Sequence, residues 1–172
     1  MQNKTKVSVA ILAASAAFFT TLEKYEGNVP VPYKDTGGVV TQGIGSLTKP
    51  DGTKIKMTDP PISRKTALEW AKAHVSKDEI VFRKSLDGVK LSQVEYDVYL
   101  DFMYNFGQGN WRSSSMLRNL KTSKYKQACD SLLKYKFVTK GKSKLDCSIR
   151  KNNCSGVWTR QLERHQKCMG AQ

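Results

Sequence analysis

Apolar residues recur at helical spacing over much of the chain, which predicts a protein built mainly from helices. A short helix is expected over residues 18–26, where apolar side chains are three and four positions apart. A longer helix is expected from a cap at Ser63 to about Lys77, and another from a cap at Ser92 to Gly107. Three shorter helices are expected toward the C-terminus, over about 113–121, 124–135 and 156–167.

The stretch after the first helix has the pattern of a small β-sheet instead. Residues 31–47 combine a β-branched run with glycines, and Gly37 and Gly38 predict a turn. The fold class is therefore expected to be α+β, with a small β-sheet lobe followed by a larger helical lobe. The helix near residues 64–77 would join the lobes, and a cleft between two lobes is the usual place for a ligand.

The first 22 residues have the composition of an export segment. Lys4 and Lys6 form a basic end, and the sixteen residues from 7 to 22 are uncharged. This run is short and rich in alanine, serine and threonine, whereas a comfortable membrane span needs about 20 strongly apolar residues. Because lysines favour the cytoplasmic side, the chain after the segment should face an oxidising compartment. A cleaved signal peptide, cut at the A-x-A pattern of residues 14–16, is the alternative to a retained segment.

The chain is strongly basic, with a formal net charge of +14. Such a charge indicates an anionic partner, which can be a nucleic acid, a membrane surface or an acidic wall polymer. The segment from Lys121 to Lys151 holds ten lysines and arginines but two acids, Asp130 and Asp146. A solvated basic face that serves solubility is the alternative. A nucleic-acid-binding module is disfavoured, because no basic–aromatic reader motif is present and an export segment does not suit it.

All four cysteines lie in the last 44 residues. A zinc site is disfavoured, because no C-x2-C pair occurs and the chain has two histidines. In an oxidising compartment an even number of cysteines predicts two disulfides. Three pairings are possible, and we favour Cys147 with Cys154 across a short polar turn, which leaves Cys129 with Cys168.

Two carboxylates near the first helix are candidates for acid–base chemistry. Cleavage of a glycosidic bond needs one protonated carboxyl group to donate to the leaving oxygen and one ionised carboxylate opposite it. Glu26 is at the predicted helix end beside the apolar wall of Tyr25, and Asp35 is in a polar turn. Their environments would therefore differ in the required sense. A glutamate and an aspartate at such places are common, so residue types alone do not decide.

The residues around these carboxylates resemble the phage-type lysozymes. Glu26-Gly27, PYKDTGG at 32–38 and TQGIG at 41–45 reproduce the family pattern E-x8-D-x5-T with its flanking glycines. Two further blocks, within residues 91–118 and GVWTRQLER at 156–164, are similar to later family segments. The resemblance extends over about residues 18–169.

This resemblance implies a lysozyme-like fold, with the active-site cleft between the lobes, and a hydrolase of peptidoglycan. Glu26 matches the general acid, Asp35 the carboxylate that positions water or stabilises the developing cation, and Thr41 the hydroxyl that holds this water. The family cleaves the β-1,4 bond between N-acetylmuramic acid and N-acetylglucosamine. No metal or other cofactor is implied. Three more positions match residues that line the sugar cleft, with core packing or helix capping as the alternative: Leu47, Tyr104 and Ser114.

The chain departs from the family at two positions. Ser46 stands where a histidine is frequent, and Gln161 replaces the second arginine of the last block. Two alternatives that also involve the bacterial cell wall remain. A non-catalytic wall-binding module on the same fold is disfavoured by the intact catalytic pattern. A lytic transglycosylase needs one essential acid, which would leave Asp35 and Thr41 without a role.

The resemblance includes phage lysozymes whose N-terminal segment anchors the enzyme and is later released. We therefore expect residues 1–22 to be a signal-anchor whose end joins the first helix of a catalytic domain over residues 18–172. The enzyme would first sit in the bacterial inner membrane, with its N-terminus in the cytoplasm, and then act in the periplasm as a monomer without a nucleic-acid partner. After release, the apolar residues of the segment would pack on the folded domain.

Overall fold

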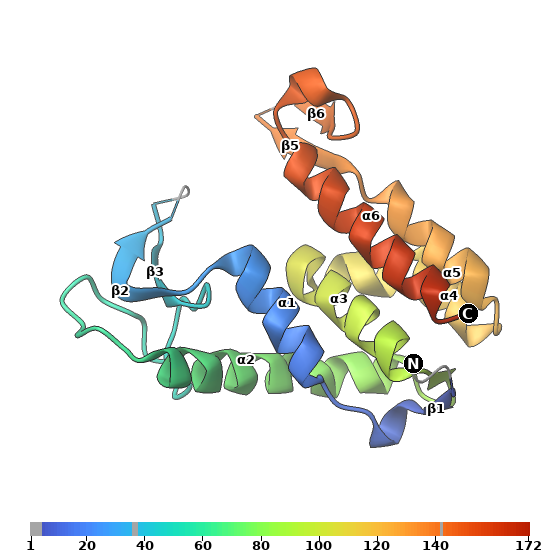
Figure 1. Ribbon diagram of the computed structural model, residues 1–172, viewed down its shortest axis with the longest axis horizontal. Coiled ribbons are helices and arrows are strands. Elements are labelled where there is room, and N and C mark those ends of the chain that lie inside the picture. The colour runs from blue at the N-terminus through green and yellow to red at the C-terminus, as the bar shows by residue number, and fades with distance from the viewer. Residues whose placement is uncertain (1–4, 36–37, 142) are drawn as a thin grey trace. The chain divides into compact units, whose positions relative to one another are not determined.

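The computed structural model describes residues 5–35, 38–141 and 143–172. The chain divides into two compact units (Figure 1). The first, a helical unit, combines the N-terminal residues up to Leu12 with Phe82–Gln172, and the second, a smaller α+β unit, is Ala13–Val81. Within the described ranges, no helix is both long and apolar enough to cross a membrane.

The α+β unit begins with helix α1, Ala16–Glu26. The side chain of Ser15 accepts a hydrogen bond from the backbone N–H of Phe18, so the helix starts two residues earlier than expected. Phe18 and Leu22 are its buried residues. Gly27, with φ 74°, ends the helix as the sequence predicted.

Strands β2, Val29–Lys34, and β3, Val40–Gly43, form the predicted small sheet as an antiparallel hairpin. Tyr33 pairs with Thr41, and the register shifts between Val29 and Tyr33. The predicted Gly37 turn lies outside the described residues. Gly38, the other turn residue, has φ 79°.

Helix α2, Arg64–Ser85, closes the unit and continues past its end. As predicted, the Ser63 hydroxyl accepts a hydrogen bond from a first-turn backbone N–H, that of Thr66. The expected end near Lys77 was wrong. Neither glycine nor proline occurs between Ser63 and Gly88, and Phe82 is fully buried, so nothing stops the helix at 77.

The helical unit is built around helix α3, Gln93–Ser113. Ser92 and Glu95 form a reciprocal capping box at its start. The expected end at Gly107 is instead a kink, where Gly107 has φ 84° and ψ 160° before helical geometry resumes. The largest fully buried side chains of this unit come from α3 and the end of α2: Trp111, Tyr96, Tyr99, Phe82 and Phe102.

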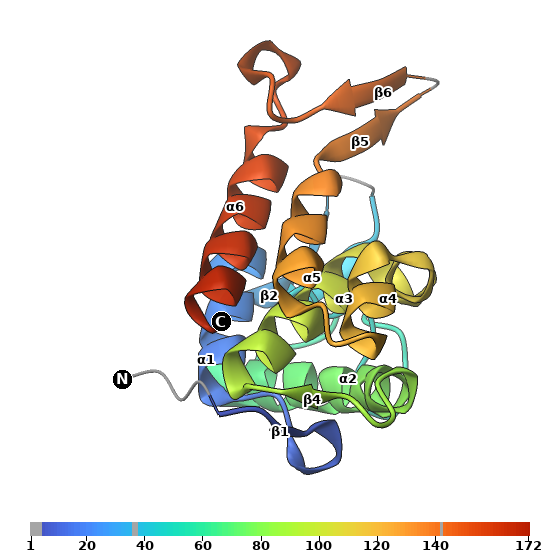
Figure 2. The same cartoon turned by 90° about the vertical axis from the view of Figure 1, so that its right-hand side faces the viewer.

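The shorter predicted helices are also present. They are α4, Ser115–Lys121; α5, Tyr125–Ser131, followed by a 3₁₀ turn at Leu132–Lys134; and α6, Ser155–Gly170. Figure 2 shows α5 and α6 beside each other. Each agrees with its expected range to within a few residues.

Two arginines of α6 are bound to one buried aspartate of α3. Arg160 Nη2 and Arg164 Nε each donate to a different carboxylate oxygen of Asp101 at 2.7 Å. Gln161, the departure from the family pattern, is fully buried, and its Nε2 donates to the backbone oxygen of Tyr135 at 3.2 Å. The glutamine therefore makes a neutral contact with the backbone that needs no counter-charge.

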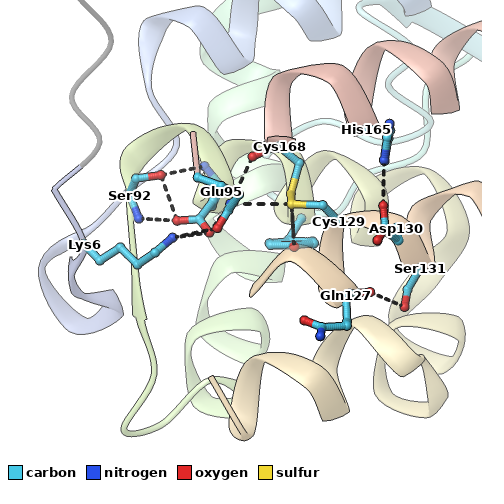
Figure 3. The surroundings of a disulfide bond; sticks show 11 residues. Lys6, Ser92, Glu95, Gln127, Cys129, Asp130, Ser131, His165 and Cys168 are labelled. Atoms are coloured by element: carbon cyan, nitrogen blue, oxygen red, sulfur yellow. Dashed lines mark hydrogen bonds and ion pairs between the residues drawn. A yellow bond between two sulfur atoms is a disulfide. The ribbon is translucent and has the colours of Figure 1, made fainter. Parts of the chain in front are cut away.

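The cysteines are paired as predicted from the sequence. Cys129 on α5 is bonded to Cys168 on α6, and Cys147 is bonded to Cys154 (Figure 3 shows the first). The first disulfide is buried beside Tyr99, whose hydroxyl lies 3.2 Å from the sulfur of Cys168. Burial raises the pKa of Tyr99 well above its usual value.

Residues 5–12 of the N-terminal segment belong to the helical unit. Strand β1, Val7–Ser8, pairs antiparallel with β4, Lys90–Leu91. A 3₁₀ turn follows at Val9–Ile11, and both Val9 and Leu12 are buried. This strand pairing was not predicted, because nothing in residues 7–8 indicates a partner some 80 positions away.

A second hairpin was not predicted from the sequence. Strands β5, Phe137–Lys140, and β6, Ser143–Asp146, pair antiparallel between α5 and α6. Lysines interrupt the β-branched residues of these strands, so the alternation typical of a strand is weak. Figure 2 shows this hairpin extending beyond the ends of α5 and α6.

Candidate active site

Glu26 is the last residue of α1 and lies against the chain that follows β3. A Cβ atom placed on Gly45 would be 3.6 Å from Glu26 Oε2 and 3.6 Å from Glu26 Cβ. The Glu26 side chain is half-buried. Its position depends on two elements, the end of α1 and the turn that contains Gly45.

This turn is closed by a pair of backbone hydrogen bonds. Gln42 N donates to Ser46 O at 3.0 Å, and Ser46 N donates to Gln42 O at 3.1 Å. Gly43 and Gly45 between them both have φ 67°. A Cβ on Gly43 would lie 3.0 Å from Cβ of Ala67 on α2, so the turn packs tightly on that helix. The glycines of the TQGIG motif therefore allow the backbone to approach both α2 and Glu26.

Asp35 lies at the start of the β2–β3 turn. Its Oδ1 accepts a hydrogen bond from Val39 N at 2.8 Å, and its own N–H donates to Val39 O at 2.9 Å. These two bonds fix the orientation of the carboxylate on the hairpin. The side chain is half-buried.

Thr41 lies on the same hairpin and is 3% exposed. Its hydroxyl donates to Val39 O at 3.2 Å. Asp35 and Thr41 thus share one backbone partner, and the hairpin holds both side chains. The structure places all three residues of the E-x8-D-x5-T pattern in the α+β unit.

The three predicted sugar-binding residues differ in environment. Leu47 belongs to the α+β unit and is 50% exposed, two positions after Gly45. Tyr104 is half-buried on α3 of the helical unit. Ser114 is buried and accepts a hydrogen bond from Leu117 N at 3.1 Å, so its hydroxyl caps α4.

Two residues that support the site were missed in the sequence. Gln42 is fully buried, and its Nε2 donates to Pro30 O at 2.8 Å and to Pro60 O at 2.9 Å. It ties β3 to β2 and to the loop before α2, but a single glutamine in a strand carries no signal for this role. Glu23, one turn before Glu26, accepts two hydrogen bonds from Arg64, at 2.7 and 2.6 Å.

The Glu23–Arg64 pair joins the last turn of α1 to the first residue of α2. Hydrogen bonds from Arg64 and from Asn28 lower the pKa of Glu23. The pairing fixes the end of α1, where Glu26 lies, relative to α2.

Both histidines have contacts within the fold. His74 Nε2 lies 2.8 Å from the backbone oxygen of Thr48, and His165 Nε2 lies 3.0 Å from Asp130 Oδ1. In the part of the chain that the structure describes, no three histidine, cysteine or acidic side chains are grouped so as to hold a metal ion. Ser46, where a histidine is frequent, is buried within the turn beside Glu26.

Comparisons with known proteins identify the family of this chain. The family described as phage lysozyme matches residues 23–169, so the chain belongs to the phage lysozyme family. The endolysin of Salmonella phage P22 is 27% identical over 132 residues, covering 73% of this chain and 85% of the relative. A SAR-endolysin of Escherichia phage 933W is 28% identical over 172 residues, covering 94% and 91%.

A solved structure supports the fold. The endolysin from Escherichia coli O157:H7 phage FAHEc1 superposes with a TM-score of 0.81 at 20% identity, covering 92% of this chain and 94% of that chain. The protein therefore has the lysozyme-like α+β fold, with a helical majority and small sheets, that the sequence predicted.

Proposed function

We propose that this chain is a muramidase that hydrolyses the β-1,4 bond between N-acetylmuramic acid and N-acetylglucosamine in peptidoglycan, and so lyses the host cell. The observation that carries the proposal is the arrangement of Glu26, Asp35 and Thr41 within one unit of a phage lysozyme family member. Glu26 is held at the end of α1 against Gly45, and the other two share the β2–β3 hairpin.

Each residue has one role in the proposed reaction. Glu26 donates its proton to the glycosidic oxygen as the bond from C1 to that oxygen breaks. Asp35 stays ionised and either stabilises the positive charge at C1 or orients the attacking water, while Thr41 helps to hold this water. The water oxygen bonds to C1, and the proton that the water releases restores protonated Glu26, so one water is consumed for each bond cut.

The test compares the purified wild type with Glu26→Gln on peptidoglycan. The amide keeps the shape of the side chain but cannot donate the proton, so turnover should fall by roughly 10²–10⁴-fold while the protein stays folded. The release of new reducing ends measures the reaction. Lysis by Glu26→Gln at near the wild-type rate would contradict the assignment.

Product mass separates hydrolysis from its closest chemical rival. Hydrolysis adds one water to the products, whereas a lytic transglycosylase forms an internal ring without water. Mass spectrometry of the released fragments should therefore give the hydrated mass. Anhydro products would favour the transglycosylase and would leave Asp35 and Thr41 without their proposed roles.

Leu47, Tyr104 and Ser114 stay predictions for the sugar-binding residues. Leu47 has an exposed apolar side chain close in sequence to Gly45, which suits contact with a sugar face. The Ser114 hydroxyl is engaged as a helix cap, so a role toward the sugar would act through the start of α4.

We also propose that residues 1–22 anchor the protein in the inner membrane before it is released to the periplasm, with the catalytic domain over residues 18–172. The 933W relative is named a SAR-endolysin, and the weakly apolar run favours exit from the bilayer. Val9 and Leu12 are buried in the folded protein, which supports the proposal that the segment packs there after release. We propose that the released form is a monomer.

A further inference from the structure

The hairpin of β5 and β6 and the loop after it carry a dense positive charge. Residues 134–151 include seven lysines and arginines but one acid, Asp146. Four exposed cations of this segment define what we call the cationic hairpin surface: Lys140, Lys144, Arg150 and Lys151. No ion pair to a carboxylate is found for these four in the described part of the chain.

The single acid of the segment is already engaged. Lys136 Nζ lies 2.8 Å from Asp146 Oδ2, and Ser148 donates to Asp146 Oδ1 from both its backbone N–H and its hydroxyl. These contacts hold the pKa of Asp146 at about 2. Asp146 therefore neutralises Lys136 and leaves the charge of the four exposed cations uncompensated.

The surface is also held in place by the fold. The strands pair from Phe137 with Asp146 to Lys140 with Ser143, and the Cys147–Cys154 disulfide closes the loop that carries Arg150 and Lys151. Asn152 Nδ2 donates to the backbone oxygen of Asp146 at 2.8 Å, which ties this loop to the hairpin. A preorganised set of cations loses less entropy on binding than a flexible tail does.

The hairpin and the loop after it expose two large apolar side chains, Phe137 at 37% and Ile149 at 44%. Val138 and its partner Leu145 are half-buried, and the ring of Phe137 is contacted by Lys144 Nζ at 4.5 Å and by Lys136 Nζ at 5.5 Å. A segment that inserts into a lipid interface presents a broad apolar face. This hairpin presents charges instead, which suits a hydrated polyanion better than a bilayer.

We propose that the cationic hairpin surface binds the carboxylates of the peptidoglycan stem peptides and so holds the enzyme on the wall, apart from the catalytic residues. This inference rests on the proposed function for its partner. The surface belongs to the helical unit, whereas the elements that hold Glu26 belong to the α+β unit, so the four cations can be replaced without changing those elements.

The experiment measures binding of the full chain to purified, insoluble sacculi, with Glu26→Gln as the background so that the wall is not digested. The test variant replaces Lys140, Lys144, Arg150 and Lys151 with glutamine. The matched control replaces four other exposed lysines of the helical unit with glutamine and therefore has the same net charge: Lys84, Lys90, Lys121 and Lys126. Far-ultraviolet circular dichroism and thermal melting of both variants verify their folding.

We expect the test variant to bind sacculi about tenfold more weakly, because four exposed ion pairs are lost, each weak by itself. The control should stay within about twofold of the background. Raising the salt concentration well above physiological should bring all three proteins to the same affinity, because exposed charges are screened. An equal loss in both variants would mean that net charge alone matters and would overturn the proposal.

Two further arms identify the source of the anion. Sacculi whose carboxyl groups have been amidated should bind the background protein as weakly as untreated sacculi bind the test variant. Unchanged binding to amidated sacculi would overturn the proposal. So would a hairpin dependence that is found on vesicles with phosphatidylglycerol but not on sacculi.

A separate measurement distinguishes this proposal from the proposed function. With Glu26 intact, the test variant should cleave a small neutral chitooligosaccharide at the wild-type rate. A wild type that cleaves no glycan at all would contradict the proposed function. The binding of sacculi by the variants in the Glu26→Gln background would still test whether the cationic hairpin surface binds the wall.

Discussion

Gly45 shows how a single residue without a side chain determines the surroundings of the proposed acid. Its φ of 67° is costly for any residue with a Cβ, and the Cβ position faces Glu26 Oε2 at 3.6 Å. The residue thus serves both the turn and the space beside the carboxyl group.

Gly45→Ala should lower kcat by about ten- to a hundredfold, because strain at its positive φ would shift the turn that lies against Glu26, and small displacements of a catalytic group have effects of that size. Gly52→Ala is the matched control: Gly52 also has positive φ, 90°, but no atom lies within 4 Å of its Cβ position. Both variants should lose about 1–2 kcal/mol of stability from backbone strain. Equal activities of the two variants would show that the contact with Glu26 is without consequence.

Glu26, Asp35 and Thr41 became catalytic candidates through the resemblance of their surroundings to the phage-type lysozymes, since residue type and spacing alone do not single them out. The sequence did not predict Gln42 or the partner of Glu23, since a buried amide and a surface carboxylate gain meaning only from the chain that surrounds them. Pro30, Pro60 and Arg64 are distant in sequence and reach these side chains only in the folded unit.

At the scale of elements, caps and breakers explain both the successes and the errors. Ser92 with Glu95 gave the start of α3 correctly, and Gly27 gave the end of α1. The predicted end of α2 near Lys77 was wrong, because no helix-breaking residue occurs before Gly88. Both missed strand pairs, β1–β4 and β5–β6, lack a strong alternation, so their pairing depends on the partner strand.

One ion pair links the N-terminal element to the helical unit. Glu95 is fully buried, and the ammonium group of Lys6 is bound to its Oε1 (Figure 3). The other oxygen, Oε2, accepts hydrogen bonds from the backbone N–H and the hydroxyl of Ser92 at 2.8 and 2.9 Å. Lys6 therefore supplies the counter-charge of a buried carboxylate.

Lys6→Met should destabilise the purified soluble protein by about 3 kcal/mol, because it leaves a buried charge without its partner. The double variant Lys6→Met with Glu95→Gln should be less destabilised than Lys6→Met alone. Lys90→Met, an exposed neighbour on β4, is the control and should stay within about 0.5 kcal/mol of wild type. Urea unfolding measures all of them, and a Lys6→Met midpoint equal to that of wild type would contradict the role of the ion pair.

At the scale of the whole molecule, residues 7–22 have to suit two environments, the bilayer and the folded protein. In the bilayer, residues 7–22 would have to span a core of about 30 Å with sixteen weakly apolar residues. In the folded protein, residues 7–8 form a strand, Val9 and Leu12 are buried, and Ala16 onward belongs to α1. The sequence predicted that this segment would pack on the folded domain, but not the strand, because its partner β4 lies far along the chain.

Three alanines of this segment allow membrane retention to be changed without changing the folded enzyme. Ala13, Ala16 and Ala17 are exposed in the folded protein, so leucine at these positions should leave the folded enzyme nearly unchanged. In the bilayer, each change from alanine to leucine adds apolar surface and favours retention in the membrane by roughly 2 kcal/mol of transfer free energy. The triple leucine variant should therefore stay in the membrane fraction and delay lysis, whereas the triple serine variant, as control, should be released at least as readily as wild type.

N-terminal sequencing of the periplasmic wild-type protein completes the test, because release and cleavage leave different ends. A start at Met1 or Gln2 is expected, since release keeps Lys6 for its pairing with Glu95 and Val7–Ser8 for β1. A start at Ala17 would show that the segment is an ordinary signal peptide. Cleavage there would also remove the Ser15 cap of α1, and with it one support of the helix that ends at Glu26.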